Sequence, residues 1–400
     1  MAARRFALPA IEDLTKEQER ARLLPKEGCH LIVGGPGTGK SVIALLRARR
    51  LHRAAENRRS GPQDYVFLAY NKLLIAASRE LMGGQVHAQT WMAWFKLVYR
   101  STLRQYCPTR NGQPFILDWE AIDEGISTAG ELAPPTPRYL VIDEGQDMPP
   151  AFYQALAQLG FEHFFVVADQ NQQITDQHST IRQIADALAI DPAERIELRL
   201  NHRNPHPVAR LARTFCVDDP ASPCTEVPAP GRSATAPVLL EYGAGSPWGF
   251  QDVVVRLLKA ADRDPSRLLG LITPDDETRQ RWFGALQTTT VKLDHGHPRI
   301  VTYASGEDKG DLRFSEGGIF VINAQSSKGL EFDRVVLADI NRYRCNPEDK
   351  HQMDDLRRRF YVMVSRARER VTLLREAGRP SPVNAILPTD PEVLSVWRPR

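Results

Sequence analysis

The sequence predicts an α/β protein with two lobes, each built on a parallel sheet that helices cover. Short apolar runs alternate with helical patterns along most of the 400 residues, as expected of parallel strands joined by helical crossovers. The apolar run 30–34 leads into a glycine-rich loop, and the apolar run 139–143 ends in two adjacent acids. Such features at the carboxyl ends of parallel strands are typical of ligand sites.

Continuous apolar runs locate the strands, because strands that are buried on both faces lack polar alternation. In the first lobe, assigned to residues 1–215, we expect strands at 30–34, 65–69, 139–143 and 164–168. Residues 216–237 are rich in proline and are interpreted as an irregular connection. In the second lobe, residues 238–400, we expect strands at 238–242, 268–273, 299–303, 318–323, 334–339 and 370–374.

Composition narrows the class of protein. Apolar residues make up 42% of the chain, enough for ordinary globular cores, and no apolar run or N-terminal segment predicts a membrane span or a secretion signal. We therefore expect a soluble, cytoplasmic protein. The cysteines, at 29, 107, 216, 224 and 345, show neither paired spacing nor a Cys-x-x-Cys motif, so we expect reduced thiols. A net charge of +3 permits a polyanionic partner without requiring one.

The run Leu31–Ser41 reads Leu-Ile-Val-Gly-Gly-Pro-Gly-Thr-Gly-Lys-Ser and predicts a phosphate-binding loop. Glycine adopts backbone angles that other residues resist, so the loop N–H groups can converge on a β-phosphate. Lys40 would reach the β and γ oxygens, and the Ser41 hydroxyl would join the coordination of Mg²⁺. The predicted contacts of this loop with the nucleotide are Gly35, Gly37, Thr38, Gly39, Lys40 and Ser41.

The run Tyr139–Glu144 supplies the acids that hydrolysis of a nucleotide needs. Asp143 would hold Mg²⁺ through its water shell, and Glu144 would polarise the water that attacks the γ-phosphate. Acids at a strand end are often simply solvated. The phosphate-binding loop makes the catalytic interpretation the stronger one.

The segment Asp143–Asp147, Asp-Glu-Gly-Gln-Asp, resembles the D-E-x-Q-D motif of superfamily 1 helicases of the UvrD/Rep type. Further segments resemble the other motifs of that family, in the family's order, from residue 15 to residue 367. They are Leu14–Gln18 (Q motif), Val66–Lys72 (Ia), Gln89–Phe95 (Ib), Val166–Ile174 (III), Leu198–Arg203 (IV), Val321–Phe332 (V) and Phe360–Ala367 (VI). The resemblance implies a P-loop NTPase with two RecA-like lobes.

The resemblance also assigns further residues to the nucleotide. Gln18 would read the adenine edge, and His202 would stack on adenine in place of the family's tyrosine. Gln172 and Arg203 would contact the γ-phosphate, and Arg366, from the second half of the chain, would be the arginine finger. Glu331 of motif V is a further predicted nucleotide contact.

The nucleic-acid contacts implied by the resemblance are Asn71, Lys72, Thr90, Trp91, Ser326 and Lys328. An alternative applies to the aromatic residues of motif Ib. Trp91, Trp94 and Phe95 recur at helical spacing, so they can equally form a core-facing stripe.

Two features depart from the family. The stretches 96–138 and 204–320 are too short for the large accessory subdomains of UvrD/Rep enzymes, and Thr175–His178 replace aromatic and arginine residues that follow motif III. Processive unwinding by this chain alone is therefore not expected.

The expected function is an Mg²⁺-dependent, nucleic-acid-stimulated ATP hydrolase that translocates on or unwinds nucleic acid. The expected track is single-stranded or partly single-stranded DNA, with RNA as an alternative. A second reading is an ATPase switch subunit of a DNA repair or phage-defence complex, with a partner such as a nuclease. A small-molecule P-loop enzyme is a third class, which motifs V and VI disfavour.

Overall fold

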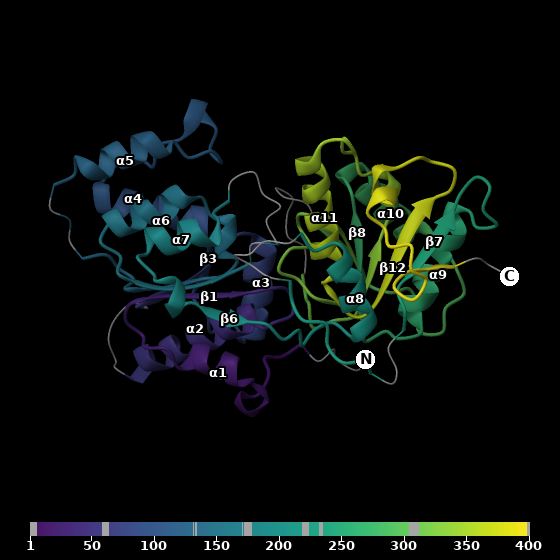
Figure 1. Ribbon diagram of the computed structural model, residues 1–400, viewed down its shortest axis with the longest axis horizontal. Coiled ribbons are helices and arrows are strands. Elements are labelled where there is room, and N and C mark those ends of the chain that lie inside the picture. The colour runs from purple at the N-terminus through teal and green to yellow at the C-terminus, as the bar shows by residue number, and fades with distance from the viewer. Residues whose placement is uncertain are drawn as a thin grey trace.

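The chain forms two lobes that lie side by side, the N-terminal one purple to teal and the C-terminal one green to yellow (Figure 1). The structure is a computed structural model, and it describes residues 6–57, 64–130, 132, 134–169, 171, 178–217, 224–231, 235–303 and 312–397. Each lobe holds one parallel sheet with helices on both faces. The α/β class and the two parallel-sheet lobes predicted from the sequence are confirmed.

The first sheet has the strand order β3-β2-β4-β5-β1-β6, and every described pair is parallel. Its strands are β1 (Cys29–Gly34), β2 (Tyr65–Ala69), β3 (Ala88–Thr90), β4 (Tyr139–Ile142), β5 (His163–Ala168) and β6 (Ile196–Leu198). The helices are α1 (Lys16–Leu23), α2 (Lys40–Asn57), α3 (Lys72–Leu81), α4 (Trp91–Leu103), α5 (Trp119–Ser127), α6 (Pro150–Gln158) and α7 (Ile181–Ala187). Helices α4 to α7 cover one face, and α1 and α2 the other (Figure 1).

The second sheet has the order β13-β7-β12-β11-β8-β10-β9 and is also parallel. Its strands are β7 (Val238–Tyr242), β8 (Leu268–Thr273), β9 (Ile300–Tyr303), β10 (Gly318–Asn323), β11 (Phe332–Leu337), β12 (Ala367–Glu376) and β13 (Ser395–Trp397). Its helices are α9 (Phe250–Asp262), α10 (Asp276–Thr288) and α11 (Lys350–Val364). Residues 238–303 thus build the lobe itself, which fits the expected absence of a large subdomain there.

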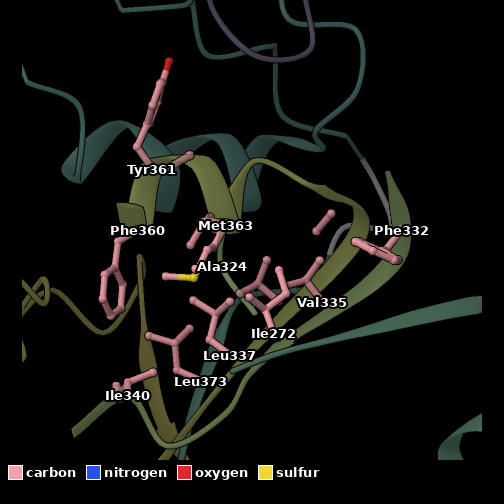
Figure 2. Close-up of a cluster of buried hydrophobic side chains, with 14 of the residues drawn as sticks. Ile272, Ala324, Phe332, Val335, Leu337, Ile340, Phe360, Tyr361, Met363 and Leu373 are labelled. Carbon is pink, nitrogen blue, oxygen red and sulfur yellow. The ribbon is translucent and has the colours of Figure 1, made fainter. Parts of the chain in front are cut away.

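Helix α11 packs on the second sheet through a cluster of buried side chains (Figure 2). Phe360 and Met363 of α11 lie over strand residues such as Leu337 and Leu373. Tyr361 points away from this cluster, and its hydroxyl lies beside Gly35 of the phosphate-binding loop. The same helix therefore anchors the second lobe and contacts the first.

Helix α8 (His206–Thr214) packs on the second lobe, although its residues fall within the stretch 1–215 assigned to the first. Its apolar face meets α11, and the Phe215 ring, just after the helix, lies 5.3 Å from that of Phe360. The chain therefore crosses between the lobes before α8. The apolar stripe of α8 explains the position, since it completes the core beneath α11.

The expectation that all cysteines are reduced is wrong for two of them. Cys216 and Cys224 form a disulfide, with an S–S distance of 1.96 Å. Cys216 follows α8, and the chain then returns to the first lobe, where the Glu226 N–H donates to the Arg199 carbonyl. The two cysteines are eight residues apart in the sequence, a spacing that does not by itself indicate a disulfide. Among the described residues, no helix is long and apolar enough to cross a membrane.

Candidate nucleotide site between the lobes

The phosphate-binding loop joins β1 to α2, as the sequence predicts. Gly37 and Gly39 have φ angles of 80° and 88°, in the left-handed region that favours glycine. A Cβ atom at Gly37 would overlap the side-chain amide of Asn201, and one at Gly35 would overlap the Thr225 methyl group. The glycines are thus required by the backbone and by close packing, and α2 begins at Lys40 with its N-terminus facing the loop.

Lys40 and Ser41 lie where a phosphate-binding loop needs them. The buried Lys40 Nζ donates to the Gly35 carbonyl at 2.8 Å and pairs with Asp169 Oδ2 at 3.5 Å. The Ser41 hydroxyl donates to Asp143 Oδ1 at 3.1 Å. Thr38, the remaining side chain of the loop, donates to the Gly35 carbonyl at 2.8 Å. The hydroxyl therefore meets the acid that follows β4, and the cation meets the acid that follows β5.

Asp143 and Ser41 fit an Mg²⁺ site. Within the part of the chain that the structure describes, Asp143 Oδ2 is buried and no hydrogen-bond partner reaches it. Burial, together with the neighbouring Glu144 carboxylate, raises the pKa of Asp143 to about 7. A buried carboxylate oxygen of this kind is satisfied by a hard cation, which takes oxygen ligands.

Glu144 is buried at the turn after β4, with a φ of 53°. Its Oε2 accepts from Gln146 Nε2 at 2.7 Å, while Gln146 Oε1 accepts from the Asp169 N–H at 2.9 Å. Burial opposes ionisation of Glu144, but Lys328, Lys40 and Arg366 together lower its pKa. The carboxylate is therefore ionised and held in one orientation, as a proton acceptor requires.

The second lobe places Arg366 in the same site. Its guanidinium is buried, and Nε donates to the Val362 carbonyl at 3.2 Å. Burial, and then the nearby Arg203, lowers the pKa of Arg366 to about 10. At neutral pH Arg366 remains a cation, and its charge favours the ionised form of Glu144.

Arg203 crosses to the second lobe and binds Glu331. Its Nε donates to Glu331 Oε1 at 2.9 Å, and Arg368 Nε donates to Glu331 Oε2 at 2.9 Å. Burial works against the charge on Glu331, but the two arginines lower the pKa of Glu331 to about 2. Next to Arg203, Asn204 Nδ2 donates to the Ser365 carbonyl at 3.0 Å. Motif IV therefore joins the lobes directly.

A cavity of about 500 Å³ opens between these groups. The predicted nucleotide residues that line it are Gln18, Gly37, Gly39, Lys40, Ser41, Glu144, His202, Arg203, Glu331 and Arg366. Gly35, Thr38 and Asp143 do not line the cavity, and Gln172 falls outside the described residues. The structure thus brings predicted residues from both lobes into one cavity.

The Gln18 amide is fixed in one orientation. Its Oε1 accepts from the Thr15 N–H at 3.0 Å, and its Nε2 donates to the Thr38 carbonyl at 2.9 Å. One lone pair and one N–H stay available at the cavity, a pattern that matches the N6 donor and N7 acceptor of adenine. The exposed His202 also lines the cavity, and its backbone N–H donates to the Gly37 carbonyl at 2.9 Å.

The sequence did not identify every residue that orders this site. Gln146 and Asp169 connect Glu144 to Lys40, and Arg368 shares Glu331 with Arg203. Gln146 lies inside the Asp143–Asp147 segment, and Asp169 directly follows the apolar run 164–168, so the sequence pattern pointed to both positions. Residues 6–9 also line the cavity, but nothing in their sequence indicated this.

Two of the six predicted nucleic-acid contacts do not lie on an open surface. Trp91 is 3% exposed and packs edge-on against Phe152 at 5.1 Å, so the core-facing alternative is correct for this residue. Lys328 is 2% exposed, and its Nζ lies 2.5 Å from Asp147 Oδ1 of the first lobe. Trp91 is buried because it belongs to the apolar stripe of α4, and Lys328 is buried because it forms an ion pair with the other lobe.

The other four predicted nucleic-acid contacts lie at the carboxyl edges of the two sheets. Asn71 caps α3, accepting from the Leu74 N–H at 2.7 Å. Lys72 is exposed, Thr90 is half-buried, and the half-buried Ser326 donates its N–H to Asn323 at 2.8 Å.

Comparison with known proteins agrees with this arrangement. The chain matches the family model of an AAA domain over residues 18–177, and that of a UvrD-like helicase C-terminal domain over residues 318–374. No curated protein matches it. A similar solved structure is the C-terminal domain of a possible DNA helicase from Lactobacillus plantarum WCFS1, at 20% identity and a TM-score of 0.34, covering 48% of this chain and 97% of that one. One family model falls on each lobe, in the order of the motifs, and together the two models support a UvrD-like superfamily 1 helicase.

Proposed function

We propose that this chain is an ATP-dependent translocase or helicase on DNA, which hydrolyses ATP between its two lobes. One observation carries the proposal: Lys40 and Glu144 of the first lobe line the same cavity as Arg366 of the second. Phosphoryl transfer needs positioning and charge neutralisation more than covalent chemistry, and these three side chains supply both. Because the site is divided between the two lobes, hydrolysis of the bond to the γ-phosphate is coupled to the distance between them.

Each residue has a role in that reaction. Glu144 accepts the proton of the attacking water, and the lowered pKa keeps it ionised for this purpose. Lys40 neutralises charge on the β- and γ-phosphates, while Arg366 stabilises charge that develops in the transition state. Ser41 and Asp143 would hold Mg²⁺, which neutralises phosphate charge when bound.

The fixed Gln18 amide supports ATP rather than GTP as the nucleotide. Guanine presents two acceptors, O6 and N7, on the edge where adenine presents a donor and an acceptor. With Oε1 facing Thr15 and Nε2 facing Thr38, the amide matches only the adenine pattern. Hydrolysis of ATP should therefore exceed that of GTP at equal concentration.

The test is steady-state phosphate release by the purified chain with no polymer, single-stranded DNA, duplex DNA or RNA, at low and moderate salt. Strong stimulation by single-stranded DNA, with weaker stimulation by RNA, is the expected result. Turnover that no polymer changes would refute a nucleic-acid motor. Stimulation by RNA alone would retain the motor and change its track.

A second function is favoured by the compact build. Between β3 and β4 the described residues form α4, a short 3₁₀ turn and α5, and between β6 and β10 they form α8 and the second lobe itself. A chain without large accessory subdomains could act as an ATPase switch whose partner, for example a nuclease, carries the effect. Slow, polymer-independent turnover that accelerates when a co-purifying partner is added would support this function over the first.

A further inference from the structure

The segment after Glu80 is unusual in its charge. No aspartate or glutamate occurs between Glu80 and Asp118, whereas acids make up 49 of the 400 residues of the chain. The same stretch carries four exposed or half-exposed basic side chains outside the nucleotide site: Lys96, Arg100, Arg104 and Arg110. A surface of this composition attracts polyanions and offers no ion-pair partner of its own.

Two aromatic rings are exposed beside these basic side chains. Tyr106 and Phe115 are each 79% exposed, the highest values among the exposed large apolar side chains of the described residues. The Arg100 guanidinium lies 4.7 Å from the centre of the Tyr106 ring. Lys96 donates to the carbonyl of Pro114, which directly precedes Phe115.

These contacts place both rings along one face of α4. Lys96 and Arg100 are four residues apart on the helix and therefore neighbours on its surface. One of them reaches the segment that carries Phe115, and the other reaches Tyr106. We call the set Lys96, Arg100, Arg104, Tyr106, Arg110 and Phe115 the α4 basic–aromatic surface.

The segment that carries Phe115, residues 109–117, is held together by backbone contacts. Thr109 and Leu117 form an antiparallel bridge, and the Arg110 N–H donates to the Ile116 carbonyl at 2.9 Å. Leu117 is buried, so the segment is anchored in the lobe. Tyr106 and Phe115 are therefore exposed side chains of a loop that backbone hydrogen bonds and a buried leucine hold against the lobe.

The core does not use these rings. The buried stripe of α4 runs through Trp91, Trp94, Phe95, Val98 and Tyr99, and it packs against α5 and α6. That stripe is complete without Tyr106 and Phe115. Exposed aromatic rings interleaved with basic side chains are the combination that holds single strands, because bases stack on the rings and phosphates meet the cations.

We propose that the α4 basic–aromatic surface binds single-stranded DNA. The proposal rests on the DNA-dependent function above and adds a binding surface outside the motifs that carry it. Tyr106 and Phe115 stack on bases of the DNA, and Arg100, Arg104 and Arg110 contact its phosphates. A protein partner with an acidic face is the competing occupant, and the absence of acids together with two π-faces favours the polynucleotide.

The first experiment removes the rings. Tyr106→Ala/Phe115→Ala should weaken binding of a labelled oligothymidylate by about tenfold or more, measured by fluorescence anisotropy. The reason is that each substitution removes the stacking contact between one ring and one base. Basal ATP hydrolysis should not change, and the stimulated rate should reach its normal maximum at higher DNA concentration. Leu23→Ala, which removes an exposed apolar side chain of α1, is the matched control and should bind as the unmodified chain does.

A conservative variant and a charge variant complete the test. Tyr106→Trp/Phe115→Trp should retain affinity, since both rings remain. Arg104→Gln/Arg110→Gln should reduce the dependence of log Kd on log salt by about 1.4, from two lost phosphate contacts. Arg182→Gln on α7, where the arginine is 86% exposed, is the control for charge.

The outcomes separate this proposal from the proposed function. An unmodified chain that binds and responds to single-stranded DNA, together with an alanine pair of equal affinity, would overturn the α4 surface alone. Weakened binding of an oligouridylate with unchanged binding of the DNA would overturn the commitment to DNA. An unmodified chain that binds no polymer would overturn both proposals.

Discussion

The substitution Glu144→Gln tests the centre of the proposed site. A glutamine has nearly the same shape, and its oxygen can accept the 2.7 Å bond that Gln146 Nε2 now donates to Glu144 Oε2. Gln146 cannot turn away, because its own Oε1 accepts from the Asp169 N–H. The variant should therefore keep the geometry of the cavity and lose only the carboxylate.

The magnitude follows from the charges around Glu144. General bases contribute about 10² to 10⁴ in rate, and most when the pKa lies near the working pH. Although burial opposes it, Lys328, Lys40 and Arg366 lower the pKa of Glu144, which makes it a weaker base. The expected loss is therefore at the lower end, about a hundredfold or somewhat more, equivalent to about 3 kcal/mol in the barrier.

The assay is phosphate release at saturating ATP and saturating polymer, with ATP affinity measured separately by titration of a fluorescent analogue. ATP binding should remain close to normal. Glu162→Gln, which removes one exposed carboxylate of the first lobe, is the control and should hydrolyse ATP normally. Turnover within about tenfold of the unmodified chain would remove Glu144 from the role of proton acceptor.

Three further predictions concern the contacts between the lobes. Arg366→Ala should lower turnover by about a thousandfold with little change in ATP affinity, because a finger acts on the transition state; single-turnover hydrolysis measures this, and a normal rate would mean that the lobes do not close as proposed. Lys328→Met should destabilise the chain by about 3 kcal/mol, because it leaves Asp147 buried without its cation, and the added change Asp147→Leu should restore most of the loss; thermal unfolding of both variants checks this, and two equally unstable variants would contradict it. The Glu331 pairs with Arg203 and Arg368 should together contribute about 3 kcal/mol at pH 7, because the pKa of Glu331 falls from 4.5 to about 2. This contribution is complete above pH 4.5 and is lost as the pH falls towards 2, so the difference in urea stability between the unmodified chain and Glu331→Gln should shrink in acid, and a difference that grows would refute the assignment.

Continuous apolar runs identified the long strands well, because a strand that is buried on both faces is apolar throughout. The runs at 30–34, 65–69 and 268–273 became β1, β2 and β8 with little change in bounds. The strands not predicted, β3, β6 and β13, are three residues long and lie at the edges of their sheets. So short a segment carries no readable period.

Contacts between distant segments were the part of the site that the sequence could not provide. The residue types of the phosphate-binding loop and of the Asp143–Asp147 segment indicated their own chemistry, and the structure places them around one cavity. Nothing local to Lys328 shows that it pairs with Asp147, or that Cys216 meets Cys224. Those pairs depend on how the two lobes lie against each other, which is a property of the whole fold.

The ion pairs that join the lobes also explain how a nucleotide could move them. Arg203, the predicted γ-phosphate contact, binds the Glu331 carboxylate, and the side chains of this pair are 14% and 26% exposed. A γ-phosphate that takes Arg203 exchanges one anion for another at a site that is already largely desolvated, so the penalty for burying the guanidinium is not incurred again. The free-energy difference between the two arrangements is then the difference between two charge-assisted pairs, a few kcal/mol at most. A gap of that size lets ATP binding favour one arrangement of the lobes and phosphate release the other, which is the property that a motor or a switch requires.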